Sequence, residues 1–167
     1  KVGEVVVAGG VRRSALISLS DLDDHDMRHA KDGQFFLTDP QRMMANNSAV
    51  YWQKPSNAEF LEEWVSLMKG GSGERGIFNR GSIMKQMPAR RQKTLEKDFD
   101  TCGTNPCGEI ILKSKQFCNL SEIVARADDT EESLLKKARI AAILGTYQSS
   151  LTNFGYLSKE WKENCEE

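Results

Sequence analysis

A cysteine flanked by proline and glycine is the residue of this chain whose surroundings best suit chemistry. Cys107 lies in the segment 104–109, whose sequence is TNPCGE. The proline fixes one backbone angle and the glycine permits a tight turn, so the segment would present the thiol outward. In an extended segment Glu109 would point to the same side as Cys107, and Asn105 would add an amide there. A thiol, a carboxylate and an amide presented together predict a catalytic loop.

The same residue types also suit a plain turn, in which the cysteine packs as a small apolar side chain. A thiolate nucleophile would need a histidine base. The only two histidines of the chain, His25 and His29, lie far from Cys107 along the sequence, in a polar segment. If Cys107 is catalytic, radical chemistry therefore fits better than nucleophilic attack.

A glycine- and arginine-rich segment near the start of the chain is a second candidate site. Paired glycines let a loop approach a ligand closely, and arginine supplies forked donors for a phosphate or a base edge. The candidate residues are Gly9, Gly10, Arg12, Arg13 and Ser14. The segment lacks the glycine and lysine spacing of a phosphate-binding P-loop, so a surface hairpin is an equal alternative.

The other cysteines and a polar triplet favour structural interpretations. Cys102 and Cys165 lie among polar residues and are interpreted as incidental. Gaps of four, ten and forty-six residues between successive cysteines do not match the spacing of a zinc site, so no metal is expected. The triplet 46–48, NNS, predicts a turn whose asparagines bond their own backbone.

The composition is that of an ordinary soluble protein. The chain has 167 residues, of which 39% are hydrophobic and 28% charged, and a formal net charge of -1. Such a balance argues against a nucleic-acid partner, and no apolar run suits a membrane span or a signal peptide. A cytoplasmic protein is expected. Because the chain opens within the apolar stretch 2–8 and ends without a helix stop signal, we expect an excerpt from a longer polypeptide.

Strands are expected to alternate with helices, which favours an α/β fold. Ser56 and Glu59 form a capping box at the start of one helix, Asp129 and Glu132 form a second one, and segment 89–100 is a charged surface segment. The expected strands are 15–20, 49–52, 76–79 and two short ones around a tight loop within 103–124; the expected helices are 25–31, 41–45, 56–70, 80–87 and 131–153.

The cysteine segments resemble the large catalytic chain of ribonucleotide reductases. The segment 105–109, NPCGE, resembles the finger loop in the middle of that family's ten-stranded α/β barrel. Cys118, in the string FCNL, resembles one half of a redox-active cysteine pair. The step of eleven residues from Cys107 suits the adenosylcobalamin-dependent class, and the string CNLSE is closest to its monomeric triphosphate reductases.

Further segments resemble the same family. Segment 9–15 resembles the specificity loop that reports which effector nucleotide is bound, and segments 76–79 and 145–153 are similar to other parts of the class. The resemblance implies that residues 1–167 are the central part of a catalytic barrel domain, a partial ten-stranded α/β barrel. In it, segment 8–15 would be the specificity loop, 103–112 the finger loop, and about 131–153 a long helix, with the rest of the barrel absent from this chain.

The resemblance also implies a reaction. Adenosylcobalamin would generate a radical that passes to the Cys107 sulfur, which removes the hydrogen at C3′ of a ribonucleotide. Glu109 would take the 3′-hydroxyl proton, and Asn105 would hold the sugar hydroxyls. Cys118 and a partner cysteine would supply two electrons and end as a disulfide. The product would be a 2′-deoxyribonucleotide.

The implied partners are the ribonucleotide substrate, a deoxynucleotide or ATP effector, a thioredoxin-type reductant and the rest of the reductase chain. The partner of Cys118 is expected before Lys1, and a phosphate-binding loop and shuttle cysteines after Glu167, so the chain alone is expected to be inactive. Two other interpretations remain, a non-catalytic nucleotide-binding or regulatory module that uses the arginine segment, and a zinc-stabilised structural domain.

Overall fold

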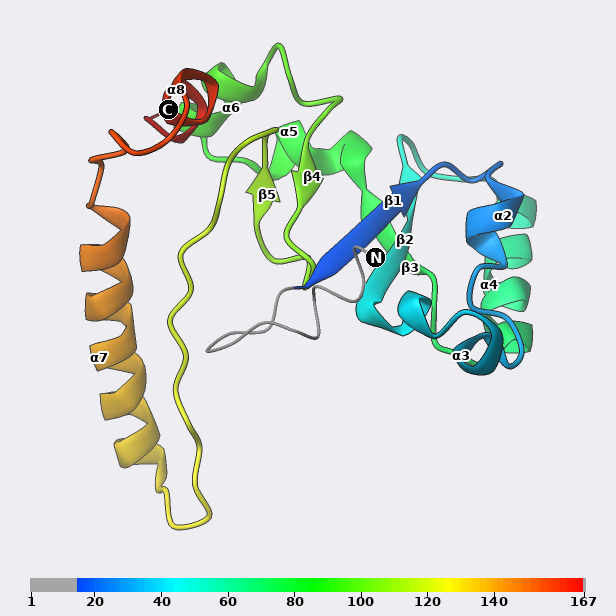
Figure 1. Cartoon of the computed structure of the whole chain (residues 1–167), viewed down its shortest axis with the longest axis horizontal. Helices are drawn as coiled ribbons and strands as arrows, with labels where there is room; N and C mark the ends of the chain where they lie inside the picture. Colours follow the sequence, from blue (N-terminus) through cyan, green and yellow to red (C-terminus); the bar gives the residue numbers. More distant parts are fainter. Residues whose placement is uncertain (1–14, 167) are drawn as a thin grey trace. The chain divides into compact units, whose positions relative to one another are not determined.

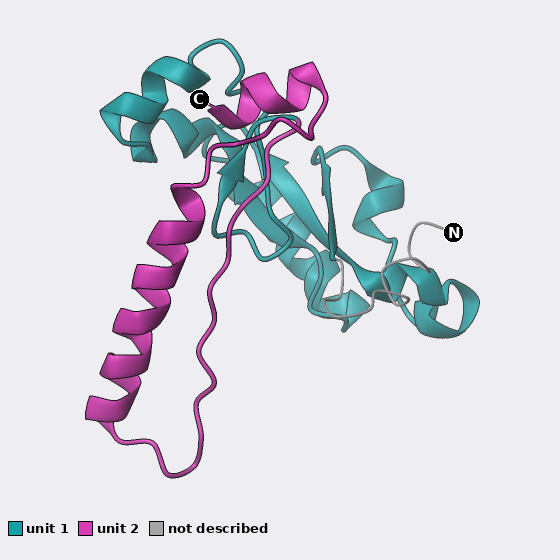
Figure 2. Ribbon diagram, turned by 60° about the vertical axis from the view of Figure 1, so that its left-hand side comes forward, with its two compact units in different colours: residues 1–114 teal, residues 115–167 magenta. Residues whose placement is uncertain are grey.

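The computed structural model describes residues 15–166, which form two compact units. The first ends at Ser114 and the second begins at Lys115 (Figure 2). The apolar stretch 2–8 lies outside the described residues, and so do the candidate ligand-binding residues Gly9, Gly10, Arg12, Arg13 and Ser14.

The first unit is built on a parallel sheet (Figure 1). Within the described part its strand order is β1-β2-β3, with β2 in the middle. Parallel neighbours need crossover connections, and short helices supply them here. Along the chain the elements are β1 (Leu16–Ser20), α2 (His25–Arg28), α3 (Phe35–Thr38), the 3₁₀ helix η1 (Pro40–Met44), β2 (Ala45–Tyr51), α4 (Asn57–Gly70) and β3 (Gly76–Asn79). The described residues contain no closed barrel, and the partial ten-stranded barrel stays a prediction.

A second group of elements completes the first unit and its core. They are the 3₁₀ helix η2 (Arg80–Ser82), α5 (Ile83–Gln86), α6 (Ala89–Leu95) and the antiparallel pair β4 (Gly103–Thr104) and β5 (Ile111–Leu112). The core joins them to the sheet, because it contains Val50, Phe78, Ile83, Leu95 and Cys102, with Ile111 packed against it. The two short strands around a tight loop are confirmed.

Three expectations for the first unit are wrong. Segment 89–100 is not wholly a charged surface, since α6 places Leu95 at 0% exposure in the core. Cys102 is also fully buried rather than polar in its surroundings, and this burial raises the pKa of its thiol. The triplet 46–48 is not a turn but lies in the first half of β2, because β1 pairs with all three residues and β3 pairs with the strand from Ser48 onward.

Helix α4 begins as expected but buries an unexpected residue. The capping box of Ser56 and Glu59 is present, and Gly71 ends the helix in the left-handed region at φ 66°. The large apolar side chains of α4 are exposed, among them Phe60, Leu61, Trp64 and Met68. The buried side chain is that of Glu63.

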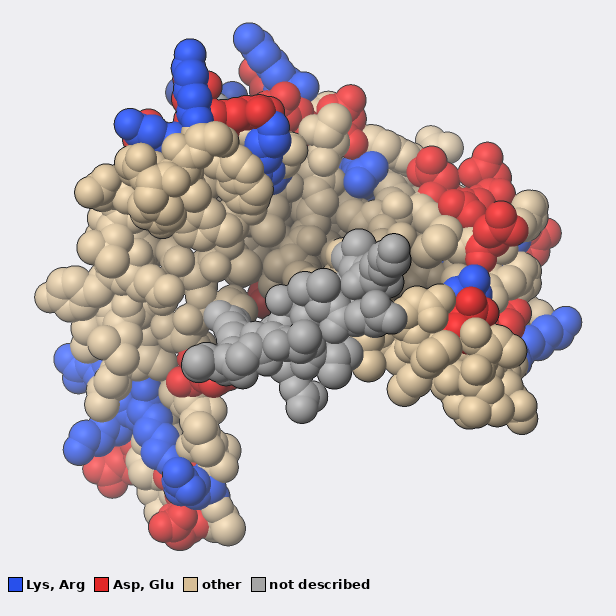
Figure 3. Space-filling model, viewed as in Figure 1, with Lys and Arg blue, Asp and Glu red and all other residues tan. Residues whose placement is uncertain are grey.

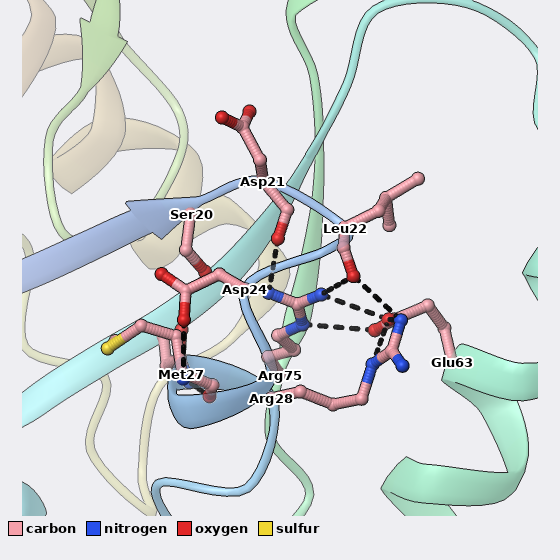
Figure 4. A network of polar contacts seen from close by, with 9 residues as sticks. Ser20, Asp21, Leu22, Asp24, Met27, Arg28, Glu63 and Arg75 are labelled. Carbon is pink, nitrogen blue, oxygen red and sulfur yellow. Dashed lines mark hydrogen bonds and ion pairs between the residues drawn. The ribbon is translucent and has the colours of Figure 1, made fainter.

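Glu63 accepts hydrogen bonds from two arginines that come from different parts of the first unit (Figure 4). Arg75 donates from Nε and Nη2 to the two carboxylate oxygens, at 3.0 and 2.9 Å, and Arg28 donates from Nε to Oε1 at 2.6 Å. Arg75 also donates from Nη1 to Ser20 Oγ at 2.8 Å. The network therefore joins α4, α2, the end of β1 and the segment before β3.

The second unit contains α7 (Glu131–Ser149) and α8 (Lys159–Glu166). The expected capping box of Asp129 and Glu132 is wrong, because Thr130 and Ser133 form it. Asp129 instead accepts from Lys137 Nζ at 2.5 Å, from Ser133 Oγ and from the Arg126 amide, which holds the pKa of this carboxyl at about 2. The helix ends at Ser149, earlier than the expected 153.

Charges on the surface are mixed. On the face shown in Figure 3, basic and acidic side chains lie side by side at the top and the lower left, while acidic side chains predominate at the upper right. No helix within residues 15–166 is long and apolar enough to cross a bilayer. The same residues contain no cluster of three or more histidines, cysteines or carboxylates able to hold a metal ion.

We predict that Glu63→Gln strongly destabilises the first unit. Loss of the carboxylate leaves the side chain of Arg75, which is 2% exposed, as a buried cation without its counterion. Breaking such a pair costs about 3 kcal/mol. Urea unfolding followed by circular dichroism measures the change. The exposed neighbour supplies the control Glu62→Gln, and equal stability of the two variants would contradict the assignment.

The Glu63 network also predicts acid sensitivity. Burial raises the pKa of Glu63, but hydrogen bonds and charges from Arg75 and Arg28 outweigh it, and the net pKa lies below the ordinary value of 4.5. The folded state therefore binds this proton less readily than the unfolded chain does, and the stabilisation is lost as the pH falls below that value. Urea titrations between about pH 7 and about pH 3 should show the difference between wild type and Glu63→Gln shrinking with acidification. A difference independent of pH would refute this.

Candidate functional site

The turn that carries Cys107 is closed by its own hydrogen bonds. The Asn105 amide donates to Ile110 O at 3.1 Å, and the Ile110 amide donates to Asn105 Oδ1 at 3.0 Å. The Gly108 amide donates to Asn105 O at 2.9 Å. Gly108 has φ 88°, in the left-handed region that a side chain disfavours. Asn105 is buried at the base of the turn while Cys107 is exposed at its tip.

Cys107 lines an open cavity of about 310 Å³ in the first unit. The sheet contributes Ile17, the residues 46–48 and the start of β3, and the turn contributes residues 106–108. Figure 1 shows the loop between β4 and β5 next to the start of β1. In open parallel sheets ligands usually bind at the carboxyl ends of the strands. Here the cavity lies beside the amino-terminal halves of the strands, where the cysteine turn meets the sheet.

A hydrogen bond joins the turn directly to the sheet. Asn46 in β2 donates from Nδ2 to the carbonyl oxygen of Pro106 at 2.5 Å. Pro106 precedes Cys107 in the chain, so the bond acts on the peptide group that leads into the cysteine.

A carboxylate in the cavity wall is fixed by an ion pair and a backbone amide. Glu74 Oε1 lies 2.9 Å from Lys31 Nζ, and Glu74 Oε2 accepts from the Asn47 amide at 2.6 Å. Lys31 also donates to Ala45 O. The segment before β3 is thus tied to the beginning of β2, which fixes that wall of the cavity.

Asn47 is a buried polar residue in the same wall. Its Nδ2 donates to Met27 O at 2.7 Å. Its Oδ1 is buried and has no hydrogen-bond partner among the described residues.

The structure brings some of the predicted site residues together. Cys107 lines the cavity, and the Asn105 side chain stabilises the turn from beneath. Glu109 is exposed and is not among the residues that line the cavity. Cys118 is half-buried and belongs to the second unit. That Cys107 and Glu109 face one sugar, with Cys118 close behind them, therefore stays a prediction.

The histidines do not serve the thiol in this cavity. Neither His25 nor His29 lines it, and His29 Nδ1 lies 2.7 Å from Asp32 Oδ2. The expectation that Cys107 acts without a histidine base stays a prediction.

Sequence reasoning missed the polar wall formed by Asn46, Asn47, Ser48 and Glu74. A signal was present, because the asparagines directly precede the apolar residues 49–51 in one uninterrupted run without glycine or proline. Such a run can continue a strand. No local pattern marks Glu74, whose partners lie 27 and 43 residues away.

Comparisons with known proteins found several relatives that carry the same protein name. A reductase described as adenosylcobalamin-dependent ribonucleoside-triphosphate reductase from Lacticaseibacillus paracasei is 37% identical over 123 residues, covering 73% of this chain and 16% of that protein. Proteins of the same description match from Lactobacillus helveticus (30% over 155 residues, 93% of this chain and 20% of the relative) and Lactobacillus acidophilus (32% over 139 residues, 82% and 18%). No family model matches the chain. No solved structure matches it either.

The similarity covers most of this chain but a small part of each relative. The chain spans a fifth or less of the length of these three proteins. It belongs to the adenosylcobalamin-dependent ribonucleoside-triphosphate reductase family, in which it corresponds to one segment of a much longer polypeptide.

Proposed function

We propose that this chain contributes the radical-bearing cysteine of a ribonucleotide reductase, which converts ribonucleotides to 2′-deoxyribonucleotides. The observation that carries the proposal is the position of Cys107, exposed at the tip of a hydrogen-bonded turn and facing a polar cavity. A radical site needs an accessible sulfur in a fixed place more than it needs a base. The names of the relatives support the class of reaction.

The cofactor in this proposal is adenosylcobalamin, which the names of the relatives specify. When bound, it would supply the radical that removes the hydrogen atom from the Cys107 thiol. One feature of the site is compatible with this cofactor: the Cys107 sulfur is exposed, so a radical from outside the turn can reach it. The cavity of about 310 Å³ is at the small end for ligand sites and suits part of a nucleotide. The corrinoid would therefore be bound mainly by other parts of the complete enzyme.

The protein groups would act on the sugar in sequence. The Cys107 sulfur radical takes the hydrogen atom from C3′, and Glu109 takes the proton of the 3′-hydroxyl. The 2′-hydroxyl then leaves as water, and the thiols of Cys118 and a second cysteine supply two electrons and two protons as they form a disulfide. Glu109 returns its proton to the 3′ oxygen, and Cys107 returns the hydrogen atom to C3′, which regenerates the sulfur radical. Asn105 is buried and does not line the cavity, and its Oδ1 accepts from the Ile110 amide, so a bond from Asn105 Nδ2 to a sugar hydroxyl would require the turn to move.

The remaining components of the proposal lie outside the described residues or outside this chain. We place the chain in a partial ten-stranded α/β barrel that the rest of the reductase polypeptide completes. The segment with Arg12 and Arg13 would report a bound deoxynucleotide or ATP effector. A thioredoxin-type reductant would restore the cysteine pair.

Substitution of the cysteine tests the proposal in a complete reductase polypeptide that carries this sequence. Cys107→Ser should abolish deoxyribonucleotide formation, because a serine hydroxyl does not form the hydrogen-abstracting radical, while ribonucleotide binding by equilibrium dialysis should persist. Cys165→Ser, which removes the half-buried thiol of α8, is the control and should keep turnover. Retained turnover in Cys107→Ser would end the proposal.

The backbone of the turn gives a second prediction. Gly108→Ala should lower turnover at least tenfold, because alanine disfavours φ 88° although its Cβ would meet no atom within 4 Å. The strain costs about 1–2 kcal/mol. Gly33→Ala is a matched control, since Gly33 has φ 60°, equally open space and a position outside the cavity. Both variants should lose similar stability in thermal unfolding. Equal turnover in the two would show that the shape of the cysteine turn does not matter.

A further inference from the structure

We infer that Asn46 is a positioning residue for Cys107, which it holds in place through the carbonyl oxygen of Pro106. The inference rests on the proposed function, because it concerns the same turn. It adds a residue that is neither on the turn nor near it in sequence, since sixty positions separate the two partners.

The hydrogen bond acts at the point where it has most effect on the cysteine. Pro106 has no backbone N–H, so its carbonyl is its one polar backbone group. That carbonyl belongs to the planar peptide group that extends to the Cα of Cys107. The bond from Asn46 Nδ2, at 2.5 Å, therefore fixes the plane from which the Cys107 side chain departs.

Asn46 is itself well anchored. It lies in β2, in register with Ile17 of β1, and β3 pairs with the other edge of β2 from Ser48, two residues further on. The next residue, Asn47, donates from its amide to Glu74 and from its side chain to Met27. A donor on such a strand keeps its position better than one on a loop.

The other contacts of the turn fix its internal shape and its stem but not the position of its tip. The hydrogen bonds between Asn105, Gly108 and Ile110 set the internal shape of the turn. Ile111 packs against the core and so anchors the stem. Asn46 contacts the tip, one residue before the sulfur.

Accurate placement matters for hydrogen abstraction, which needs the sulfur in contact with one C–H bond. A displacement of about 1 Å can lower such a rate about a hundredfold. Loss of the Asn46 hydrogen bond should therefore lower kcat, while KM changes little because the ribonucleotide is bound by many other groups.

The first test needs no catalysis. Asn46→Asp keeps the shape of the side chain but replaces the donor by a carboxylate that repels the Pro106 carbonyl, and Asn46→Ala removes the group. Hydrogen–deuterium exchange at the amides of Gly108 and Ile110, which donate to Asn105 within the turn, should become roughly three- to tenfold faster, the range expected for one lost hydrogen bond. Asn46→Asp should exchange at least as fast as Asn46→Ala.

Asn57→Ala is the control, an exposed asparagine at the start of α4 that does not line the cavity. Circular dichroism should show the same thermal unfolding for all three variants, since Asn46 is exposed and outside the core. Unchanged exchange in both Asn46 variants would overturn the inference.

The second test uses steady-state turnover of the complete reductase. Both Asn46 variants should lower kcat at least tenfold with KM within about twofold of wild type. Faster exchange with unchanged kcat would overturn the positioning role. Cys107→Ser in the same assay separates the two proposals, because full turnover in that variant refutes the radical function, whereas the exchange measurement still decides whether Asn46 holds the turn.

Discussion

The pairing of β2 on both of its edges is the constraint on which the first unit depends. Ser48 is aligned with Leu19 of β1 and with Gly76 of β3, so the centre of β2 has little freedom to shift. The second half of the strand buries Ala49, Val50 and Tyr51. The first half presents polar groups to the cavity and to the cysteine turn. One strand thus joins the apolar core to the candidate site, and a shift in its register would disturb both.

Two carboxylates hold the connections between the strands. Glu63 forms ion pairs with Arg75 and Arg28. Glu74 forms an ion pair with Lys31 and accepts a hydrogen bond from a backbone amide. Buried charges are costly unless they are paired, so these groups favour one arrangement of the crossovers over looser ones. The Glu74 contacts matter for the site, because Glu74 lines the cavity and its contacts fix that part of the wall. The Glu63 contacts act farther away, where α4 meets the end of β1.

Local sequence signals predicted the parts of the fold that depend on local chemistry. The capping box of Ser56 and Glu59, the strands at 16–20 and 76–79, and the tight loop between two short strands are confirmed. The misses have a common cause. Polar residues at 46–48 extend a strand because neighbouring strands pair with them, and Leu95 and Cys102 are buried because distant segments cover them. None of these contacts is visible in a window of ten residues.

In the candidate site, too, the features set by local sequence were predicted and those set by distant contacts were missed. Cys107 and its turn were predicted from a proline, a glycine and a family resemblance, and the cysteine does line a cavity. Asn46 and Glu74 were missed, since their roles arise only when segments sixty or twenty-seven residues apart meet. The placement of Glu109 and Cys118 relative to a substrate stays a prediction.

The most direct measurement is a crystal structure of a complete reductase carrying this sequence, with a ribonucleotide bound. We expect the Cys107 sulfur in van der Waals contact with C3′ of the sugar and the Asn46 hydrogen bond to Pro106 intact. A sugar bound away from this cavity, with Cys107 facing solvent or another surface, would contradict the radical role of the cysteine.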